Sequence, residues 1–277
     1  MNKLDTAKRT QIVAALVEGC SIRSTVRMTG ASKNTIAKLL VELGAACSEY
    51  LNKTLVNLNS KRIQCDEIWQ YVGAKQKNVP AEKRDEFGIG DVWTWVAMDA
   101  DSKLICSCLV GKRDHACATE FIQDLAVRLV HRVQLTTDGL KMYLNAVADG
   151  FGDNIDYAML VKVYGNDPEG QKRYSPAVCT GCKKENKIGD PDPKRVSTSY
   201  IERQKLTMRM SMRRFTRLTN AFSKKLENHI AAIAIHCVFY NFVRIHSTLR
   251  CTPAMAAGVT NKLWSLEDMI TLLNRAV

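Results

Sequence analysis

The sequence predicts an α/β protein in which a mixed five-stranded sheet with flanking helices follows a small all-helical domain. Apolar residues recur with helical spacing in the first 45 residues, whereas from residue 61 onward short β-rich runs alternate with helical ones. Hydrophobic residues make up 46% of the 277 positions, enough for a sizeable core. The length exceeds that of a usual single domain, which favours one large domain and one small one.

Three helical patterns occupy the N-terminal region. The first carries an apolar face and ends at Gly19, the second runs from Ser21 to Gly30, and the third begins at Ser32. Serine is a preferred residue before a helix, and glycine commonly ends one. A helix, a tight turn containing glycine and a further helix form the helix-turn-helix arrangement.

We therefore predict a helix-turn-helix DNA-binding domain over residues 1–48, followed by a linker over 49–60. The leading turn of the third helix is the part that such domains insert into the major groove. The residues expected to contact DNA there are Lys33, Asn34, Thr35 and Lys38.

After the linker, the residue pattern changes from one typical of helices to one that includes strands. The predicted elements, in order, are strand 62–73, strands 91–99 and 103–111 joined by a turn at Asp99–Ser102, helix 115–130, strand 132–139, helix 140–152 and strand 155–165. Three antiparallel strands, a helix, a strand, a helix and a strand is the order of the RNase H-like fold. This predicts an RNase H-like domain over residues 61–250.

Residues 166–198 interrupt the pattern. They hold four of the six prolines and many charged residues, so we predict a loop-rich insertion there. A long helical tract follows over 199–243, and residues 251–277 read as a C-terminal helical tail.

Three acidic residues stand at places where a fold of this kind brings them together. Asp66 lies among apolar and aromatic strand residues, where a charge is costly unless a cation compensates it. Asp138 ends the fourth predicted strand, and Glu202 lies in the first turn of the long helical tract. The first and fourth strands of an RNase H-like sheet are neighbours, so we expect these carboxylates to converge. Hard oxygen ligands suit Mg²⁺ or Mn²⁺, and two such ions would serve phosphoryl transfer.

Alternatives exist for two of these acids. Glu67 competes with Asp66, because adjacent strand residues face opposite sides of a sheet; we expect Asp66 in the site and Glu67 at its periphery. Glu202 has a purely structural alternative, since an acid in a first turn favours the helix N-terminus.

The charge balance points to a polyanionic partner. Forty Lys and Arg residues oppose 28 Asp and Glu residues, which leaves a net charge of +12 and favours nucleic acid over other partners. Basic residues recur every four positions in the long helical tract, forming a stripe expected to follow the DNA backbone; a merely solvated basic helix is the alternative. The expected DNA contacts in the second half of the chain are Arg203, Lys205, Arg209, Arg213, Arg217, Arg244 and His246.

The ten cysteines are scattered, and several lie in apolar runs where a free thiol packs as a small hydrophobe. Cys179 and Cys182 have zinc-like spacing, but a structural zinc site normally needs four ligands, so zinc is not expected there. The sequence opens with no secretory signal pattern, and no uncharged run reaches membrane-spanning length. We therefore expect a cytoplasmic protein without a membrane partner.

Four ordered segments, "IQCDEIWQYVG", "TTDGLKMYLNAV", "TSYIERQ" and "YNFVRIHSTLRCTPAMAAG", together resemble the DDE transposases of bacterial insertion sequences, in particular the family named after the first insertion sequence. The resemblance spans nearly the whole chain. It implies cleavage of DNA at the ends of a mobile element and transfer of the freed strand into target DNA. Asp66, Asp138 and Glu202 match the metal-binding acids of that family.

The resemblance also implies partners and location. Double-stranded DNA, both terminal inverted repeats and target, would be the substrate, and pairing two ends requires at least a dimer. The expected location is the bacterial cytoplasm, at the nucleoid. Two rival functions remain: a non-catalytic helix-turn-helix DNA-binding protein, such as a repressor or domesticated remnant, and a metal-dependent nuclease without strand transfer.

Two features depart from the family pattern. The gap between Asp138 and Glu202 is longer than the compact integrase spacing, so the insertion must fold outside the active site. Position 205 is lysine where related sequences favour asparagine, and this lysine either binds DNA or disturbs the site.

Overall fold

The computed structural model describes residues 4–165, 179–216 and 220–274. Its strands are β1 (Arg62–Val72), β2 (Gly90–Asp99), β3 (Ile105–Gly111), β4 (Gln134–Asp138), β5 (Asp156–Tyr164) and β6 (Cys179–Ile188). The α-helices are α1 (Thr6–Val17), α2 (Ile22–Thr29), α3 (Lys33–Thr54), α4 (His115–Arg128), α5 (Met142–Phe151), α6 (Ser199–Ser211), α7 (Leu226–Val238), α8 (Pro253–Ala256) and α9 (Leu266–Thr271).

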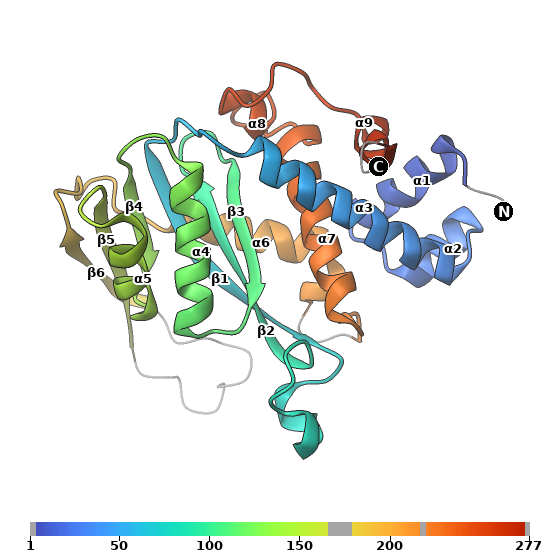
Figure 1. The fold of residues 1–277 in the computed structure, drawn as a ribbon, viewed down its shortest axis with the longest axis horizontal. Coiled ribbons are helices and arrows are strands. Elements are labelled where there is room, and N and C mark those ends of the chain that lie inside the picture. The colour runs from blue at the N-terminus through green and yellow to red at the C-terminus, as the bar shows by residue number, and fades with distance from the viewer. Residues whose placement is uncertain (1–3, 166–178, 217–219, 275–277) are drawn as a thin grey trace.

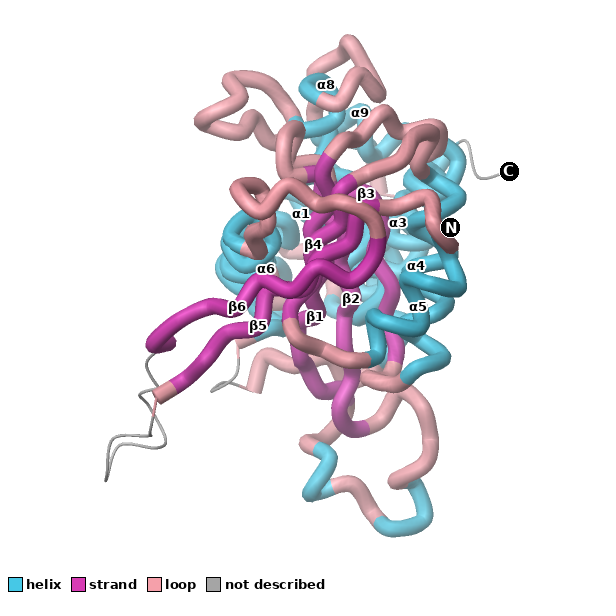
Figure 2. Tube along the Cα trace, turned by 90° about the vertical axis from the view of Figure 1, so that its left-hand side faces the viewer, coloured by secondary structure: helices cyan, strands magenta, loops and turns pink. Residues whose placement is uncertain are grey.

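The strands form one mixed sheet of order β3-β2-β1-β4-β5-β6. β1 pairs antiparallel with β2 and parallel with β4, and β5 continues the parallel part. Helices α4 and α5 cover one face of the sheet, and α6 lies on the other (Figure 1, Figure 2). The five predicted strands thus occur in the predicted order, and the mixed α/β arrangement is consistent with an RNase H-like fold.

The sheet has six strands rather than the five expected. β6 lies within the segment predicted to be a loop-rich insertion, whose first part, 166–178, falls outside the described residues; 189–198 is irregular, as expected. β6 pairs antiparallel with β5, and the two strands project from the sheet as a ribbon (Figure 2). Most β6 side chains are exposed, so the strand has no apolar alternation for a sequence pattern to reveal.

The long helix expected over 199–243 is broken into two. α6 ends at Ser211, because Met212 adopts an extended conformation (φ −125°, ψ 100°). Met212 and Phe215 belong to the apolar cluster that residues of α6, α7 and the sheet form. The predicted basic stripe is therefore not continuous on one helix face: Arg213 lies in a 3₁₀ turn, and Arg217 lies outside the described residues.

The three N-terminal helices form as predicted. Ser21 and Ser32 cap α2 and α3 by accepting hydrogen bonds from backbone N–H groups in the first turn, and Gly30 closes α2 in the left-handed conformation (φ 70°). α3 runs on to Thr54, so the first half of the segment 49–60, expected to be a linker, is helical.

α3 packs along α7, and a methyl group at Gly44 would collide with Ala231. Residues of α1, α3, α7 and α9 belong to the same hydrophobic cluster as the sheet residues facing α4 and α5. The N-terminal helices therefore share a core with the sheet. In the part of the chain that the structure describes, no helix combines the length and apolarity needed to cross a membrane.

Candidate functional site

The ends of β1 and β4 bring together acidic side chains from distant parts of the sequence. These strands are parallel and pair Cys65 with Thr137, so Asp66 and Asp138 follow next to each other. Asp66, Glu67 and Asp138 each offer a carboxylate oxygen, and these oxygens lie within 4.8 Å of one another. Asp66 and Glu67 are each only 5% exposed. The predicted convergence of the first two acids is present in the structure.

Glu67 also belongs to the cluster, although its side chain starts from the face of β1 opposite to that of Asp66. The sequence predicts instead that Glu67 lies at the periphery of the site. β4 ends at Asp138 while β1 continues to Val72, so carboxylates from both faces of β1 can approach this point. Two Arg113 nitrogens donate to Glu67 Oε1 at 2.6 and 2.9 Å, and the Tyr143 hydroxyl lies 3.3 Å from Oε2. Burial and the charges of Asp138 and Asp66 raise the pKa of Glu67 to about 7, although Arg113 opposes this.

Asp66 is compensated by a lysine from α6. The ammonium of Lys205 contacts Oδ2, and the Glu67 backbone N–H donates to Oδ1 at 2.7 Å. Burial raises the pKa of Asp66, Lys205 opposes that effect, and Asp138 adds to it. The charge inside an apolar strand is thus tolerated because a cation and a backbone donor face it.

Glu202, the third predicted acid, lies near this cluster without joining it. Its Oε1 is 2.7 Å from Lys162 Nζ on β5 and accepts a hydrogen bond from Thr198 at 2.5 Å. Burial works against its ionisation, but Lys162, Thr198 and the charge of Lys205 outweigh burial and hold the pKa of Glu202 below its ordinary value. Lys205 therefore acts on both Asp66 and Glu202.

Gln64 explains why the start of α6 lies beside β1. Its side-chain oxygen accepts hydrogen bonds from the backbone N–H groups of Tyr200 and Ile201, both at 3.0 Å. Gln64 and Asp66 lie two residues apart on one strand and so share a face. Sequence reasoning missed Gln64, Arg113 and Lys162, because a polar partner is recognisable only once its neighbour in space is known.

The donor set fits a hard divalent cation. Carboxylate oxygens are the protein ligands that Mg²⁺ and Mn²⁺ prefer, and clustered buried carboxylates repel one another unless positive charge is present. Asp66 and Asp138 would hold such an ion, with Glu67 and Glu202 as the nearby acids that could complete its coordination.

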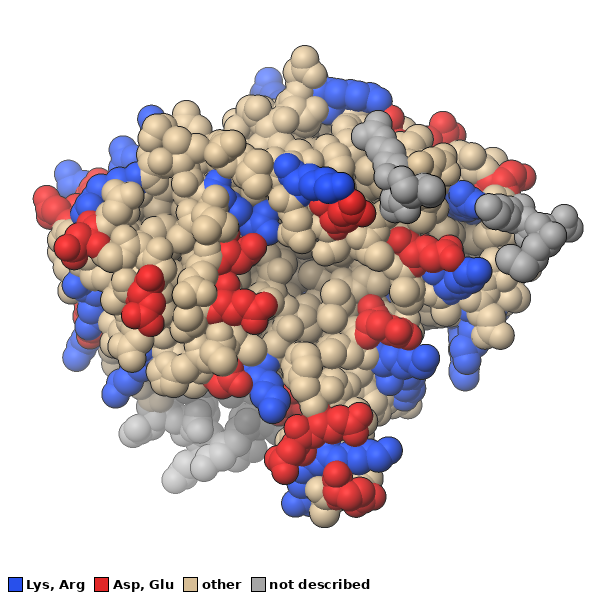
Figure 3. Space-filling view, in the orientation of Figure 1, with Lys and Arg blue, Asp and Glu red and all other residues tan. Residues whose placement is uncertain are grey.

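The predicted DNA contacts occupy several surfaces. Lys33, Asn34 and Lys38 are exposed at the start of α3, and Thr35 is half-buried there. The structure places the remaining ones as follows: Arg203 exposed and Arg209 half-buried on α6, Arg213 exposed after α6, Arg244 exposed and His246 half-buried after α7. On the face over α4 and α5, acidic and basic side chains are interspersed (Figure 3), so the net positive charge is not gathered into one patch there.

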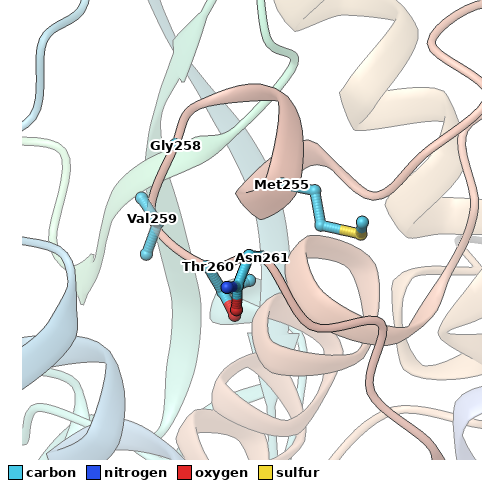
Figure 4. Close-up of a pocket in the computed structure, with 5 residues that line it drawn as sticks. All are labelled: Met255, Gly258, Val259, Thr260 and Asn261. Atoms are coloured by element: carbon cyan, nitrogen blue, oxygen red, sulfur yellow. The ribbon is translucent and has the colours of Figure 1, made fainter.

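Hollows in the surface of the described residues include two that differ in character. One, of about 700 Å³, is lined by Met255, Gly258, Val259, Thr260 and Asn261 (Figure 4), none of which is ionisable. The other, of about 420 Å³, lies beside α6 and has several cationic residues in its wall. The larger hollow contains none of the predicted site residues.

No protein-family model matches the sequence, and no curated protein matches it. Among solved structures, a piggyBac transposase synaptic complex with hairpin DNA is similar with a TM-score of 0.48 and 10% identity, over 97% of this chain and 69% of that one. The Mos1 strand transfer complex is similar with a TM-score of 0.25 and 11% identity, over 86% of this chain and 79% of that one. Both TM-scores lie below 0.5, so neither similarity assigns a function to this chain.

Proposed function

We propose that this protein is a DNA transposase that cleaves DNA at the ends of a mobile element and joins the freed 3′ hydroxyl to target DNA. The observation that carries the proposal is the meeting of Asp66 and Asp138 at adjoining strand ends. The basic composition supports a nucleic-acid substrate, and the ordered motifs that resemble insertion-sequence transposases support the reaction class.

In this proposal Asp66, Asp138 and Glu202 hold Mg²⁺ or Mn²⁺, two ions in the active complex. Bound ions would activate the attacking water or hydroxyl and stabilise the leaving oxygen. The chain itself supplies position and charge. Gln64 fixes the start of α6 against β1, and Arg113 with Tyr143 hold Glu67 in place. Lys162 and Lys205 put positive charge beside the acids, where the phosphate of a DNA strand would lie.

The contact between Lys205 and Asp66 favours one rival function. An ammonium that permanently neutralises Asp66 would reduce metal binding and leave a DNA-binding protein without catalysis. A nuclease that cuts without joining would use the same acids. These functions differ in reactions that can be measured separately.

The test uses the full chain with supercoiled plasmid carrying candidate terminal repeats, and with pre-cleaved ends for strand transfer. We expect Mg²⁺-dependent cutting and joining that EDTA abolishes. Asp138→Asn should lose both reactions while fluorescence anisotropy shows unchanged DNA binding. Glu120→Gln removes an exposed acid of α4 and is the matched control, expected to behave as the unmodified protein.

Each contrary outcome has a distinct meaning. Cutting retained by Asp138→Asn would remove this residue from the site. Specific binding of the repeats without any cutting by the unmodified protein would favour the non-catalytic alternative. Cutting without joining of pre-cleaved ends would favour the nuclease. The mass of the protein–DNA complex in solution tests the proposed pairing of two ends by at least a dimer.

A further inference from the structure

The 420 Å³ hollow lies between α6, the turn that follows β2 and the segment after the π-helical turn Phe239–Val243. Its volume falls within the range of small-ligand sites. Its wall combines residues that are far apart in sequence, including Lys103, Tyr200, Gln204 and Arg244. The π-helical turn is anchored by Asn241, whose side chain both donates to and accepts from the backbone of Ile105.

The wall of this hollow is cationic. Lys103, Arg203 and Arg244 line it, and no Asp or Glu lines it among residues 4–165, 179–216 and 220–274. Asp101, which lies near Lys103, is paired with Arg62. Burial, and after it the charges of Lys103 and Arg244, hold the pKa of His246 below its ordinary value. An anionic group would be favoured in it.

Gln204 supplies a buried donor at the same place. Gln204 is one of the residues that line the hollow, it is 2% exposed, and within the described ranges its amide nitrogen has no hydrogen-bond partner. A buried N–H group without an acceptor costs free energy. An oxygen of a ligand in the hollow would satisfy it.

Aromatic rings accompany the cations. Tyr200 is 41% exposed, and the Lys103 ammonium lies 3.2 Å from the centre of its ring. Tyr240 also lines the hollow and is buried. A flat base stacks favourably on an aromatic side chain, and its phosphate pairs with nearby cations. The combination of ring, cations and amide donor matches a nucleotide better than a simple anion.

α6 separates this hollow from the acidic cluster. Tyr200, Arg203, Gln204 and Thr207 lie at the i, i+3, i+4, i+7 positions of one helix face and line the hollow. Glu202 and Lys205, from the same helix, instead pair with Lys162 and Asp66. The two places are thus about one helix diameter apart, roughly 10 Å.

We propose that this hollow is a second nucleotide-binding site, in which the phosphate lies among Arg203, Arg244 and Lys103 and the base lies against Tyr200. Its occupant is a nucleotide of a DNA strand, distinct from the phosphate attacked at the acidic cluster. The assignment to DNA rests on the proposed function, whereas affinity for a nucleotide does not.

The test measures binding to the full chain in EDTA, so that cleavage plays no part. The probes are inorganic phosphate, dAMP and a short single-stranded oligonucleotide, each titrated by calorimetry or anisotropy. We expect dAMP and the oligonucleotide to bind and to compete with each other. Arg203→Gln and Arg244→Gln should each weaken dAMP binding about tenfold or more, as loss of a charged hydrogen bond implies. Arg84→Gln, an exposed arginine outside the hollow, is the matched control and should change nothing.

Gln204→Glu keeps the shape of the side chain but adds a negative charge, and it should abolish dAMP binding. Because Gln204 is buried, thermal unfolding is measured for every variant. If Gln204→Glu unfolds the protein, the test rests on the two arginine variants, whose positions are exposed. A photoreactive adenine nucleotide should also crosslink to the peptide that contains Tyr200.

The outcomes separate this proposal from the proposed function. Asp138→Asn should bind dAMP normally although it cannot cut. Absence of dAMP binding by the unmodified protein would overturn the second site and leave the cleavage result untouched. Equal affinity for phosphate and dAMP would overturn the role of the base. Binding of dAMP that the oligonucleotide does not displace would overturn the assignment to a DNA strand and identify a free nucleotide as the ligand.

Discussion

Lys205 on α6 and Asp66 on β1 form an ion pair in which the lysine side chain is 22% and the aspartate side chain 8% exposed. Glu202 is paired in the same way with Lys162, at 2.7 Å. Two of the three proposed ligand acids thus already have a cationic partner from the chain. Any divalent ion must compete with these ammonium groups or share the carboxylates with them.

Replacement of Lys205 by methionine should therefore increase the affinity of the site for Mn²⁺. Removal of one positive charge a few ångströms from the ion is worth about 1.4 kcal/mol or more near a protein surface, which corresponds to about tenfold in affinity. In EDTA the same variant should lose about 3 kcal/mol of stability, the lower end of the cost of breaking a buried ion pair, because Asp66 is left buried without its partly exposed partner. Calorimetric Mn²⁺ titration and urea unfolding measure the two effects.

Lys205→Arg is the matched control, since it keeps the positive charge, and its Mn²⁺ affinity should stay near that of the unmodified protein. An unchanged Mn²⁺ affinity in Lys205→Met would show that this lysine does not compete with the ion.

Glu202 and Glu67 offer a second test, because sequence reasoning selects the first and the compact cluster contains the second. We expect Glu202→Gln to lower both Mn²⁺ affinity and DNA cleavage by about a hundredfold, as loss of a metal ligand implies. Glu67→Gln should cost less than tenfold, because the glutamine oxygen can still accept from Arg113 while its amide N–H₂ can donate to the Tyr143 hydroxyl oxygen. Electron paramagnetic resonance of bound Mn²⁺ and plasmid cleavage are the measurements. The reverse ranking would make Glu67 the third ligand.

These residues also show what the sequence could predict. Asp66 and Asp138 were predictable because a strand order fixes which strand ends are neighbours. Entry of Glu67 into the cluster depends on β4 stopping while β1 continues, which no local pattern records. The exposed strand β6 lacks apolar alternation, and the break after α6 falls at Met212, where no glycine or proline signals it. The elements in which apolar residues recur at regular spacing were therefore predicted from the sequence. The features that depend on tertiary contacts were not.

Two buried histidines of α7 should make stability depend on pH. His229 and His236 are 0% and 2% exposed, and no ring nitrogen of either has a partner in the described part of the chain. Burial, aided by the charges of Arg214 and Arg244, lowers the pKa of His229 to about 3 and of His236 to about 4. The unfolded chain takes up these protons below about pH 6.5, so folding stability falls as the pH drops towards the folded values. Between pH 7 and 5 the loss should be about 2 kcal/mol for each histidine.

Urea unfolding at both pH values, compared between the unmodified protein and a His229→Leu, His236→Leu double variant, measures this loss. The raised pKa of Glu67 acts in the opposite direction, and the comparison of variants cancels it. His131→Gln alters an exposed histidine and is the control. Parallel pH profiles for the double variant and the unmodified protein would contradict the expectation.

The close packing of α3 on α7 predicts a steric effect. Gly44→Ala would place a methyl group against Ala231, and relief of that overlap requires the helices to separate. Overpacking of this kind costs about 1–3 kcal/mol. Gly181→Ala, on exposed β6 with nothing within 4 Å of the added carbon, should change stability by less than about 0.5 kcal/mol. Equal urea midpoints for the two variants would mean that α3 and α7 tolerate a wider separation.

The unbroken course of α3 has a mechanical consequence. Its 22 residues span about 33 Å as a single rod, with the exposed residues Lys33, Asn34 and Lys38 at one end and the seam with α7 farther along. α7 leads directly into the π-helical turn and Arg244. A tilt of the exposed N-terminal end of α3 would therefore be transmitted to its contact with α7, because no flexible linker interrupts the helix.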